Sequence, residues 1–530
     1  MYNGEYTYQV PFWKAEYHDP LLVSYKDNPL IEGLPPPYNR DQVYDLLKYN
    51  PGYEENYRQW PDHLRLHLIL EASRFFQPLD IHFELEERFS RLIRAGYVGR
   101  NPLDLGYWPE TKRRLYLMKQ NSVFSSIPRV PIQGFTLIGI SGIGKSRAIA
   151  SILSLYPQVI QHNEYNGKRF TWTQLVWIKL ECPPDSSISG LCHDFFHQVD
   201  RLLGTNYYVN HGLRGRPNVE QMRVAMGGVA SDHSIGVIVI DEIQNLRLVR
   251  SDRADKMLSF LVQLDNTIGV PMVFVGTPKA RAALEGEFRR ARRAAGQGDI
   301  PWERMQKAKG EEEEKYSEWR VFLETLWKYQ YVHEKSDLTD ELSEVMYDES
   351  QGITDITIKL YFLSQIRAIE RKQERITADI IRKTAQERLR SVQEFLFALR
   401  TNNKRLLRKY EDIQPIDLEG AVWQALRNVA PSLESMPGTS PVLESPTTGA
   451  NDGRQEENGV GTEPGSQNTQ QRSEAGGATR ESKDHAAKVE GGLLEMAIKG
   501  REHGITAYDV LKKRGVIRDL SEYLVEEVRS

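Results

Sequence analysis

Cysteine is scarce in this sequence, with only Cys182 and Cys192 among 530 residues. Two cysteines cannot build a disulfide scaffold, and their scarcity fits a reducing compartment. No apolar run approaches the about 18–20 residues that a membrane-crossing helix needs. The first residues also lack the basic stretch followed by an apolar stretch that marks a secretory signal. We therefore expect a soluble, cytoplasmic protein without a membrane partner.

A strong net charge is also missing. The 69 Lys and Arg residues nearly balance 73 Asp and Glu residues, which leaves a net charge of −4. The overall charge therefore gives no argument for nucleic-acid binding, and any DNA contact must come from a local basic patch or from assembly of several subunits.

Aromatic residues are absent from Gln424 to Ala507. Within that stretch, residues 436–485 are dominated by Gly, Ser, Thr, Pro, Glu and Gln. Such a composition buries too little apolar area to offset the chain entropy, so we predict disorder there. Apolar periodicity returns at about residue 490, which indicates either a tethered docking peptide or chance periodicity in an unstructured end.

The remaining sequence indicates an α/β protein with several segments. Short β-branched runs alternate with helical stretches, which predicts a parallel sheet with helices on both faces. The expected strands are Phe135–Ile138, Leu175–Leu180, Gly236–Ile240 and Val270–Val275. We divide the chain into an N-terminal α-rich extension with a partner-binding arm (1–125), an ATPase core (126–300), a helical lid (301–430), a disordered linker (431–489) and a docking segment (490–530). Within the extension, helical periodicity runs from Asp62 to Leu92, with Asp62 as its cap.

The strongest motif is Gly139-Ile140-Ser141-Gly142-Ile143-Gly144-Lys145-Ser146, which matches the phosphate-binding pattern G-x-x-x-x-G-K-[ST] in full. It follows a predicted strand and precedes a predicted helix that begins at Arg147, which is the context the motif requires. Glycines let backbone N–H groups curl around phosphate oxygens, and a helix N-terminus adds partial positive charge. We expect this loop and Arg147 to bind ATP, with Lys145 at the β- and γ-phosphates and Ser146 on Mg²⁺.

A second motif follows the strand Gly236–Ile240, which ends in Asp241-Glu242. Four apolar residues followed by two acids form the Walker B pattern. We expect Asp241 to hold the metal and Glu242 to act as general base on the attacking water. The glutamate favours an ATPase that hydrolyses ATP over a small kinase.

Further candidates belong to the AAA+ type of ATPase that these motifs indicate. Thr277 follows the next strand and is either the sensor 1 residue beside the γ-phosphate or a threonine in a turn. Arginines crowd the segment after it, and one of them either reaches the nucleotide of a neighbouring subunit or lies on a solvated helix face; they are Arg289, Arg290, Arg292 and Arg293. Lys359 follows a glycine and a helix start in the helical region, as a sensor 2 residue does.

Two weaker signals complete the list. His63 and His67 are four residues apart, but no cysteine or carboxylate cluster completes a metal site, so we interpret them as surface or core histidines. Thr205, Asn206, Arg214 and Arg216 lie between the second strand and the Walker B strand. Their loop is either a set of DNA phosphate contacts or an ordinary polar surface loop.

Three strings resemble TnsC, the transposition regulator, and its shorter TniB relatives: the phosphate loop, Asp241-Glu242-Ile243-Gln244-Asn245-Leu246 and Val275-Gly276-Thr277. A fourth, from Ile93 to Pro102, contains Gly-Tyr-Val-Gly-Arg-Asn-Pro and also looks like TnsC. It lies upstream of the phosphate loop, where AAA+ proteins build part of the nucleotide base pocket, so the resemblance implies that Arg100 lines it. The resemblance covers roughly residues 60–400.

The resemblance implies an ATP-dependent ring or helical homo-oligomer on double-stranded DNA. It would connect a target-site selector of the TnsD or TniQ type, sometimes with a CRISPR effector, to the transposase subunits TnsA and TnsB, without itself cutting or joining DNA. Two other classes remain open. A signalling ATPase would usually carry repeats after its core, and none is found. A helicase loader would usually carry a helix-turn-helix module, which the short C-terminal segment does not suggest.

Overall fold

The computed structural model describes residues 12–20, 22–120, 134–248, 256–257, 260–261, 269–280, 298–308, 317–407 and 416–429. The chain divides into two units, Met1–Thr439 and Ser440–Ser530, and every described residue belongs to the first. The predicted linker 431–489 and docking segment 490–530 lie outside the described residues. Among the helices that are described, none combines the length and the apolar character needed to cross a membrane.

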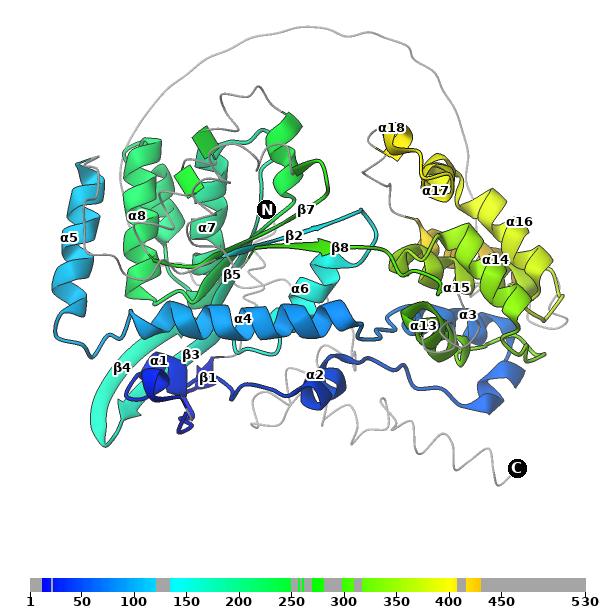
Figure 1. Cartoon of the computed structure of the whole chain (residues 1–530), viewed down its shortest axis with the longest axis horizontal. Coiled ribbons are helices and arrows are strands. Elements are labelled where there is room, and N and C mark those ends of the chain that lie inside the picture. Colours follow the sequence, from blue (N-terminus) through cyan, green and yellow to red (C-terminus); the bar gives the residue numbers. More distant parts are fainter. Residues whose placement is uncertain are drawn as a thin grey trace, which may run out of the picture. The chain divides into compact units, whose positions relative to one another are not determined.

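A five-stranded parallel sheet forms the centre of the described unit (Figure 1). Its strands, in spatial order, are β5 (Trp177–Glu181), β6 (Val237–Asp241), β7 (Met272–Gly276), β2 (Phe135–Gly139) and β8 (Asp299–Trp302). Every residue of β2, β6 and β7 is buried. Continuous apolar runs of this kind suit strands that are covered on both faces. Three predicted strands are confirmed as β2, β6 and β7, and the fourth, Leu175–Leu180, overlaps β5.

Alternate residues of each strand enter two different cores. Ile178, Ile238 and Phe274 pack against α7 (Ile188–Leu203) and α8 (Val219–Asp232). Val239 and Val273 pack on the opposite face against α4 (Asp80–Val98) and α6 (Lys145–Leu153). Figure 1 shows these two helix pairs on opposite sides of the strands. Helices on both faces of a parallel sheet confirm the predicted layer architecture.

A hairpin beside the central sheet was not predicted. Strands β3 (Val159–Tyr165) and β4 (Lys168–Leu175) pair antiparallel, and β1 (Trp13–Lys14) adds to β3 in parallel. Asn166 and Gly167 connect the strands with φ angles of 49° and 72°, which is the left-handed turn that Asn-Gly favours in tight hairpins. The expected strand Leu175–Leu180 is therefore the end of β4 followed by β5.

The N-terminal extension is wrapped around the core as short helices. They are η1 (Val23–Tyr25), α1 (Pro29–Glu32), α2 (Arg40–Leu47), η2 (Glu55–Gln59), α3 (Asp62–Ala72) and α5 (Tyr107–Lys119). The single helix expected from Asp62 to Leu92 is two helices, α3 and α4, separated by a segment that contains Pro78. Proline cannot donate the hydrogen bond that would continue a helix. Asp62 lies in the first turn of α3 rather than at its N-cap, which is Pro61.

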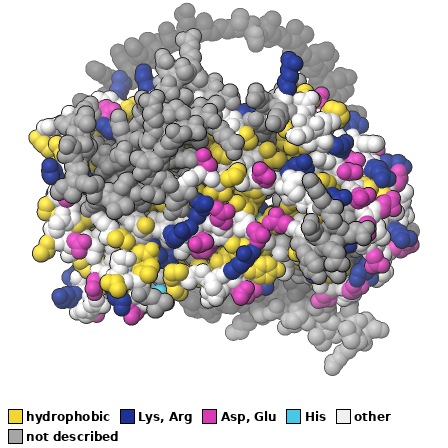
Figure 2. Space-filling view, viewed as in Figure 1, with side chains coloured by type: hydrophobic (Ala, Val, Ile, Leu, Met, Phe, Trp, Pro, Cys, Tyr) yellow, Lys and Arg dark blue, Asp and Glu magenta, His cyan; other side chains and the backbone are white. Residues whose placement is uncertain are grey.

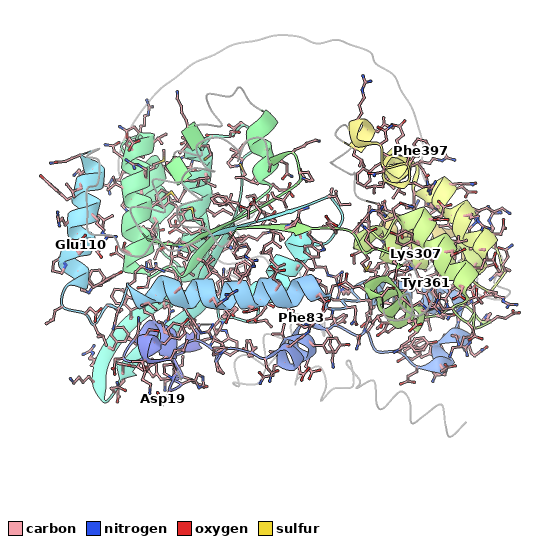
Figure 3. All side chains as sticks on the ribbon, viewed as in Figure 1. Asp19, Phe83, Glu110, Lys307, Tyr361 and Phe397 are labelled. Atoms are coloured by element: carbon pink, nitrogen blue, oxygen red, sulfur yellow. The ribbon has the colours of Figure 1, made fainter. Side chains whose placement is uncertain are left out.

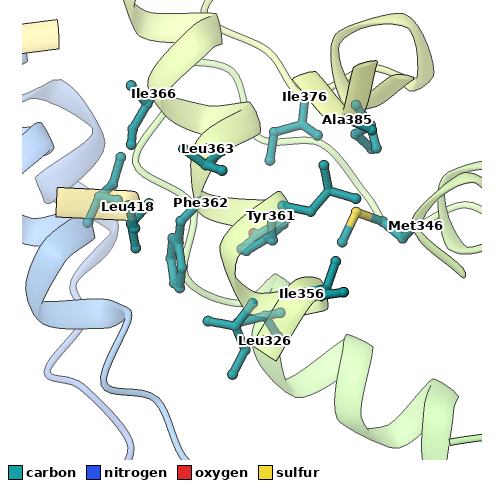
Figure 4. Close-up of a cluster of buried hydrophobic side chains, with 14 of the residues drawn as sticks. Leu326, Met346, Ile356, Tyr361, Phe362, Leu363, Ile366, Ile376, Ala385 and Leu418 are labelled. Atoms are coloured by element: carbon teal, nitrogen blue, oxygen red, sulfur yellow. The ribbon is translucent and has the colours of Figure 1, made fainter. Parts of the chain in front are cut away.

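Every regular element described after residue 317 is a helix. These helices are α13 (Glu318–Trp327), α14 (Asp340–Ser350), α15 (Thr354–Glu370), α16 (Ala378–Arg388), η5 (Arg390–Val392), α17 (Gln393–Arg400), α18 (Lys404–Leu407) and α19 (Leu418–Val429). Helix α15 is buried on most of its surface and forms the centre of the cluster in Figure 4, where Tyr361 and Phe362 meet Leu418 of α19 and Leu326 of α13. Figure 3 locates Tyr361 and Lys307 in this region and Phe83 on α4. Helix α3 of the extension also packs on α15 and α19, so the extension and the helical region share one core.

Candidate nucleotide-hydrolysis site

The phosphate loop connects β2 to α6. Gly142 and Gly144 have φ angles of 76° and 105°, a left-handed region that other residues rarely adopt. A Cβ on Gly139 would lie 2.9 Å from the carbonyl oxygen of Trp302 in β8. The glycines of this motif are therefore needed for the backbone path itself.

The side chains of Lys145, Ser146 and Arg147 lie where the loop enters α6. Lys145 Nζ donates to the carbonyl oxygens of Gly139 and Ile140 at 2.8 and 3.0 Å, so the ammonium group lies over the loop. Ser146 is exposed in the first turn of α6. Arg147 donates to the carbonyl of Arg74, and its guanidinium carbon lies 5.3 Å from the Phe76 ring centre. Burial lowers the Arg147 pKa, an effect that Asp355 partly opposes.

Asp241, at the end of β6, has a buried carboxylate with two polar partners. Its Oδ1 accepts from the Glu242 backbone N–H at 2.9 Å, and its Oδ2 lies 2.9 Å from Lys179 Nζ of β5. Only 2% of Asp241 is exposed. Because a buried carboxylate is stable only with such partners, the ion pair with Lys179 explains how this acid persists at the sheet edge. Sequence reasoning missed Lys179, since a lysine within a strand carries no motif.

Glu242 and Thr277 border the same edge. Glu242 is exposed and has a φ angle of 57°, which is uncommon for a residue other than glycine. Thr277 is buried, and its Oγ1 has no hydrogen-bond partner among the described residues. An unsatisfied buried hydroxyl is unusual in a folded protein and is often found where a ligand binds.

The strand register brings these residues together. Ile240 of β6 pairs with Phe274 of β7, and Gly276 of β7 pairs with Ile138 of β2. The phosphate loop, Asp241-Glu242 and Thr277 thus follow the carboxyl ends of three neighbouring parallel strands. That edge is where ligands bind in open α/β sheets.

The helical region reaches the phosphate loop through the start of α15. The Asp355 backbone N–H donates to the Gly142 carbonyl oxygen at 3.2 Å. The Asp355 side chain forms an ion pair with Lys359 at 2.8 Å, one turn later. Lys359, the sensor 2 candidate, is therefore one helical turn from the residue that contacts the loop.

An aromatic cluster lies beside the loop and was not predicted. The His82 ring centre is 5.0 Å from that of Phe76 and 5.2 Å from that of Trp302. His82 Nδ1 accepts from the Leu79 backbone N–H at 2.8 Å, and burial lowers the His82 pKa to about 4. The cluster gives the loop a rigid apolar flank, because a histidine that stays neutral behaves as part of the core.

Arg100 lies away from this edge. Its guanidinium is buried and donates to the carbonyl oxygens of Gly96 and Ile235, both at 2.6 Å. Ile235 precedes β6, so Arg100 is at the amino end of a strand whose carboxyl end carries Asp241. The structure therefore places Arg100 at the opposite edge of the sheet from the phosphate loop. There its guanidinium satisfies backbone carbonyl oxygens by hydrogen bonds.

The remaining candidates that the structure describes lie in other parts of the fold. Arg289, Arg290, Arg292 and Arg293 lie outside the described residues. Thr205, Asn206, Arg214 and Arg216 share the α7–α8 connection, which contains the π-helix η3 (Tyr208–Leu213). Within it, Thr205 Oγ1 donates to Asp200 Oδ1 at 2.6 Å, whereas Arg214 and Arg216 are exposed. His63 and His67 are also exposed.

A cluster of Asp62, His333 and Glu374 has the composition of a metal site, but two basic side chains already pair with its carboxylates. Arg65 and Lys372 both form ion pairs within the cluster. The carboxylates are therefore already neutralised.

Comparison with known proteins supports the geometry of the core. Residues 133–284 match a protein family described as an AAA domain. The chain has the AAA+ P-loop fold. The strand order β5-β6-β7-β2-β8, the phosphate loop after β2 and the helices on both sheet faces all belong to this fold. No curated protein matches the chain.

Several solved structures are distantly similar. The Aeropyrum pernix ORC1 protein in complex with DNA is 14% identical, with a TM-score of 0.33 over 61% of this chain and 83% of that one. Cdc6p from Pyrobaculum aerophilum is 13% identical, with a TM-score of 0.32 over 62% and 86%. Drosophila ORC bound to DNA is 10% identical, with a TM-score of 0.31 over 60% and 78%.

The residues at the edge include two kinds of ligand that a magnesium ion takes, and a bound ion would replace Lys179 as the cationic partner of Asp241. Asp241 offers carboxylate oxygens from the end of β6, and Ser146 offers a hydroxyl from the first turn of α6. Hard oxygen ligands of these two kinds are what Mg²⁺ takes in nucleotide sites, where it keeps several waters and phosphate oxygens as its other ligands. Bound there, the ion would neutralise charge on the β- and γ-phosphates.

Proposed function

We propose that this chain is an ATPase that hydrolyses ATP to ADP and phosphate at the carboxyl edge of its central sheet. The observation that carries the proposal is the convergence of the phosphate loop, Asp241-Glu242 and Thr277 on that edge. A phosphate-binding loop alone would support binding only. A carboxylate beyond the metal-binding aspartate adds a base for the attacking water.

Each residue would have a separate role in the reaction. The loop N–H groups and Lys145 would hold the phosphates, and Glu242 would accept a proton from the water that attacks the γ-phosphorus. The bond from that phosphorus to the bridging oxygen then breaks, and ADP leaves with the electron pair. Thr277, whose hydroxyl has no hydrogen-bond partner among the described residues, would orient the water or a γ-phosphate oxygen. Such positioning provides most of the catalysis in phosphoryl transfer.

Two substitutions test this assignment. Lys145→Ala should abolish nucleotide binding, measured with a fluorescent ATP analogue. Glu242→Gln should keep binding and lose turnover by roughly two orders of magnitude or more, the usual range for a positioned base. Near-normal hydrolysis by Glu242→Gln would overturn the assignment.

We further propose that the ATPase serves transposition, as a DNA-bound oligomer that connects a TnsD- or TniQ-type selector to TnsA and TnsB. The resemblance to TnsC supports this, chiefly through the strings Asp241–Leu246 and Gly96–Pro102. Stimulation of hydrolysis by duplex DNA would favour this role over a signalling ATPase. Capture of transposase subunits rather than a helicase would favour it over a helicase loader.

The trans-acting arginine belongs to the same proposal. If one of the arginines between Arg289 and Arg293 acts on the nucleotide of a neighbour, an inactive arginine variant mixed with Lys145→Ala protein regains activity, because one mixed interface has both parts. No recovery at any mixing ratio, for each arginine in turn, would contradict the role.

The C-terminal segment would capture the transposase through its linker, which holds it at high effective concentration. Deletion of 490–530 should abolish transposase binding and leave hydrolysis and DNA binding nearly intact. Unchanged transposase affinity would place the docking surface elsewhere.

A further inference from the structure

Gln244 lies between the two polar groups that border the candidate site, and its side chain is bonded to both. It belongs to η4 (Ile243–Leu248), directly after the Asp241-Glu242 pair, and only 8% of it is exposed. Its Oε1 accepts from the Thr277 backbone N–H at 3.0 Å. Its Nε2 donates to Glu242 Oε2.

The amide orientation follows from these partners. A backbone N–H can only donate, so the Gln244 oxygen must face Thr277, and the amide NH₂ must then face the Glu242 carboxylate. Neither end of the side chain can be exchanged for the other without losing a bond. The glutamine thus provides a charge-assisted donor to Glu242 and an acceptor to the tip of β7.

The surroundings of Gln244 are shaped for it. A Cβ on Gly276 would lie 2.9 Å from Gln244 Oε1 and 2.6 Å from Ile243 Cγ2. Only glycine at this position therefore leaves room for the glutamine. On the other side of η4, Asn245 Nδ2 donates to the Cys182 carbonyl oxygen at 2.7 Å. The short helix is anchored to the strand ends on both sides.

Glu242 requires such an anchor. Its left-handed backbone, with a φ of 57°, is a strained conformation that persists only where neighbours hold it. An exposed glutamate side chain would otherwise sample several rotamers, whereas a general base must stay within hydrogen-bond reach of one water.

We propose that Gln244 is a positioning residue that fixes the Glu242 carboxylate and couples it to Thr277. This rests on the proposed ATPase function. The Thr277 backbone N–H is bonded to Gln244, and its hydroxyl has no partner in the part of the chain that the structure describes. A phosphate that engages the hydroxyl therefore acts on the same residue that holds the glutamine. Through Gln244, the position of the Glu242 carboxylate would therefore depend on Thr277, the residue after β7 that would contact the substrate.

Two isosteric substitutions separate the parts of this role. Gln244→Glu keeps an acceptor for Thr277 but presents a carboxylate to Glu242, and Gln244→Met removes both bonds. Each should lower kcat by about 10- to 100-fold, the range for a lost hydrogen bond to a charged group, with the affinity for ATP changed less than about twofold. Gln174→Met is the control, because Gln174 is also a buried glutamine with both ends bonded, to His162 and to the Leu30 carbonyl oxygen. It should leave kcat unchanged.

A double-mutant cycle distinguishes positioning from a merely structural role. Because Gln244 acts through Glu242, Gln244→Met should add little to Glu242→Gln in single-turnover hydrolysis. Full additivity, or wild-type kcat in both Gln244 variants while Glu242→Gln is inactive, would overturn this inference and leave the ATPase intact. Normal turnover in Glu242→Gln would instead overturn the proposed function. If Gln244→Met does not fold, the kcat of Gln244→Glu alone tests the positioning role.

Discussion

Arg65 and Glu374 form a bidentate ion pair between parts of the chain that are far apart in sequence. Arg65 Nη1 lies 2.7 Å from Glu374 Oε2, and Nη2 lies 2.9 Å from Oε1. The arginine is fully buried, and it also donates to the Tyr331 carbonyl oxygen and to Asp62. Since Arg65 is in α3 and Glu374 follows α15, this pair ties the N-terminal extension to the helical region.

Removing one partner of this pair should destabilise the whole unit. Arg65→Met should lower the free energy of unfolding by about 3–5 kcal/mol, because it leaves two largely enclosed carboxylates, each 15% exposed, without their donor. Glu387→Gln is the control, since its pair with Arg367 is half exposed and should matter by less than about 1 kcal/mol. Chemical denaturation measures both. Equal changes in the free energy of unfolding for the two variants would mean that the Arg65–Glu374 pair contributes no more than an ordinary surface ion pair.

His82 should make stability depend on pH. Its pKa is lowered to about 4 by burial, whereas an unfolded histidine titrates near 6.5. Between these values the unfolded chain binds more protons than the folded chain, so stability falls as pH decreases from about 6.5 to 4. The loss reaches about 3 kcal/mol for this residue.

His82→Gln isolates that contribution. Glutamine can still accept from the Leu79 N–H at this helix position, but it does not titrate. The variant should show a smaller decrease in Tm between pH 6.5 and 5 than the wild type. His67→Gln, at an exposed position, should keep the wild-type slope, and an identical slope in His82→Gln would contradict the assignment.

The parts that could be predicted from the sequence are those set by local pattern. Continuous apolar runs identified the three fully buried strands β2, β6 and β7. Gly139–Ser146 identified the loop between strand and helix, because its glycines are required by backbone angles. The Asn166-Gly167 turn was an available hairpin signal that was not used. Pro78 likewise could have divided the helix expected from Asp62 to Leu92.

The parts that could not be predicted depend on tertiary contacts. Lys179 pairs with Asp241 only because β5 lies next to β6. Trp302 reaches the loop from β8, a four-residue strand with two exposed positions and little apolar pattern. Arg100 was assigned by its place upstream of the loop, but α4 crosses the sheet and carries it to the other edge. Figure 2 shows acidic and basic side chains mixed over one face, as the near-neutral charge suggests.

Lys359 should affect turnover more than ADP binding. It lies one turn from Asp355, whose N–H contacts Gly142 of the phosphate loop. If Lys359 contacts the γ-phosphate, Lys359→Met should lower kcat about tenfold or more and leave ADP affinity unchanged. Asp355→Asn is the matched control, because it frees Lys359 without removing it and keeps the backbone bond. Wild-type hydrolysis by Lys359→Met would show that the ion pair only stabilises α15.

The α7–α8 connection should contribute to DNA binding through Arg214 and Arg216 rather than through Thr205. Both arginines are exposed on either side of Gly215, and the backbone there is fixed by bonds from Arg214 N to Val209 O and from Arg216 N to Leu213 O. Thr205 is instead engaged by Asp200, whose carboxylate also accepts from the N–H groups of Tyr207 and Tyr208.

Each phosphate contact contributes about 0.9 to the slope of log affinity against log salt concentration. The double variant Arg214→Gln/Arg216→Gln should therefore weaken duplex binding and reduce that slope by about 2, without a change in sequence preference. Thr205→Ala and Arg371→Gln, the latter an exposed arginine of the helical region, should bind DNA like the wild type. A wild-type slope in the double variant would place the DNA surface on other residues.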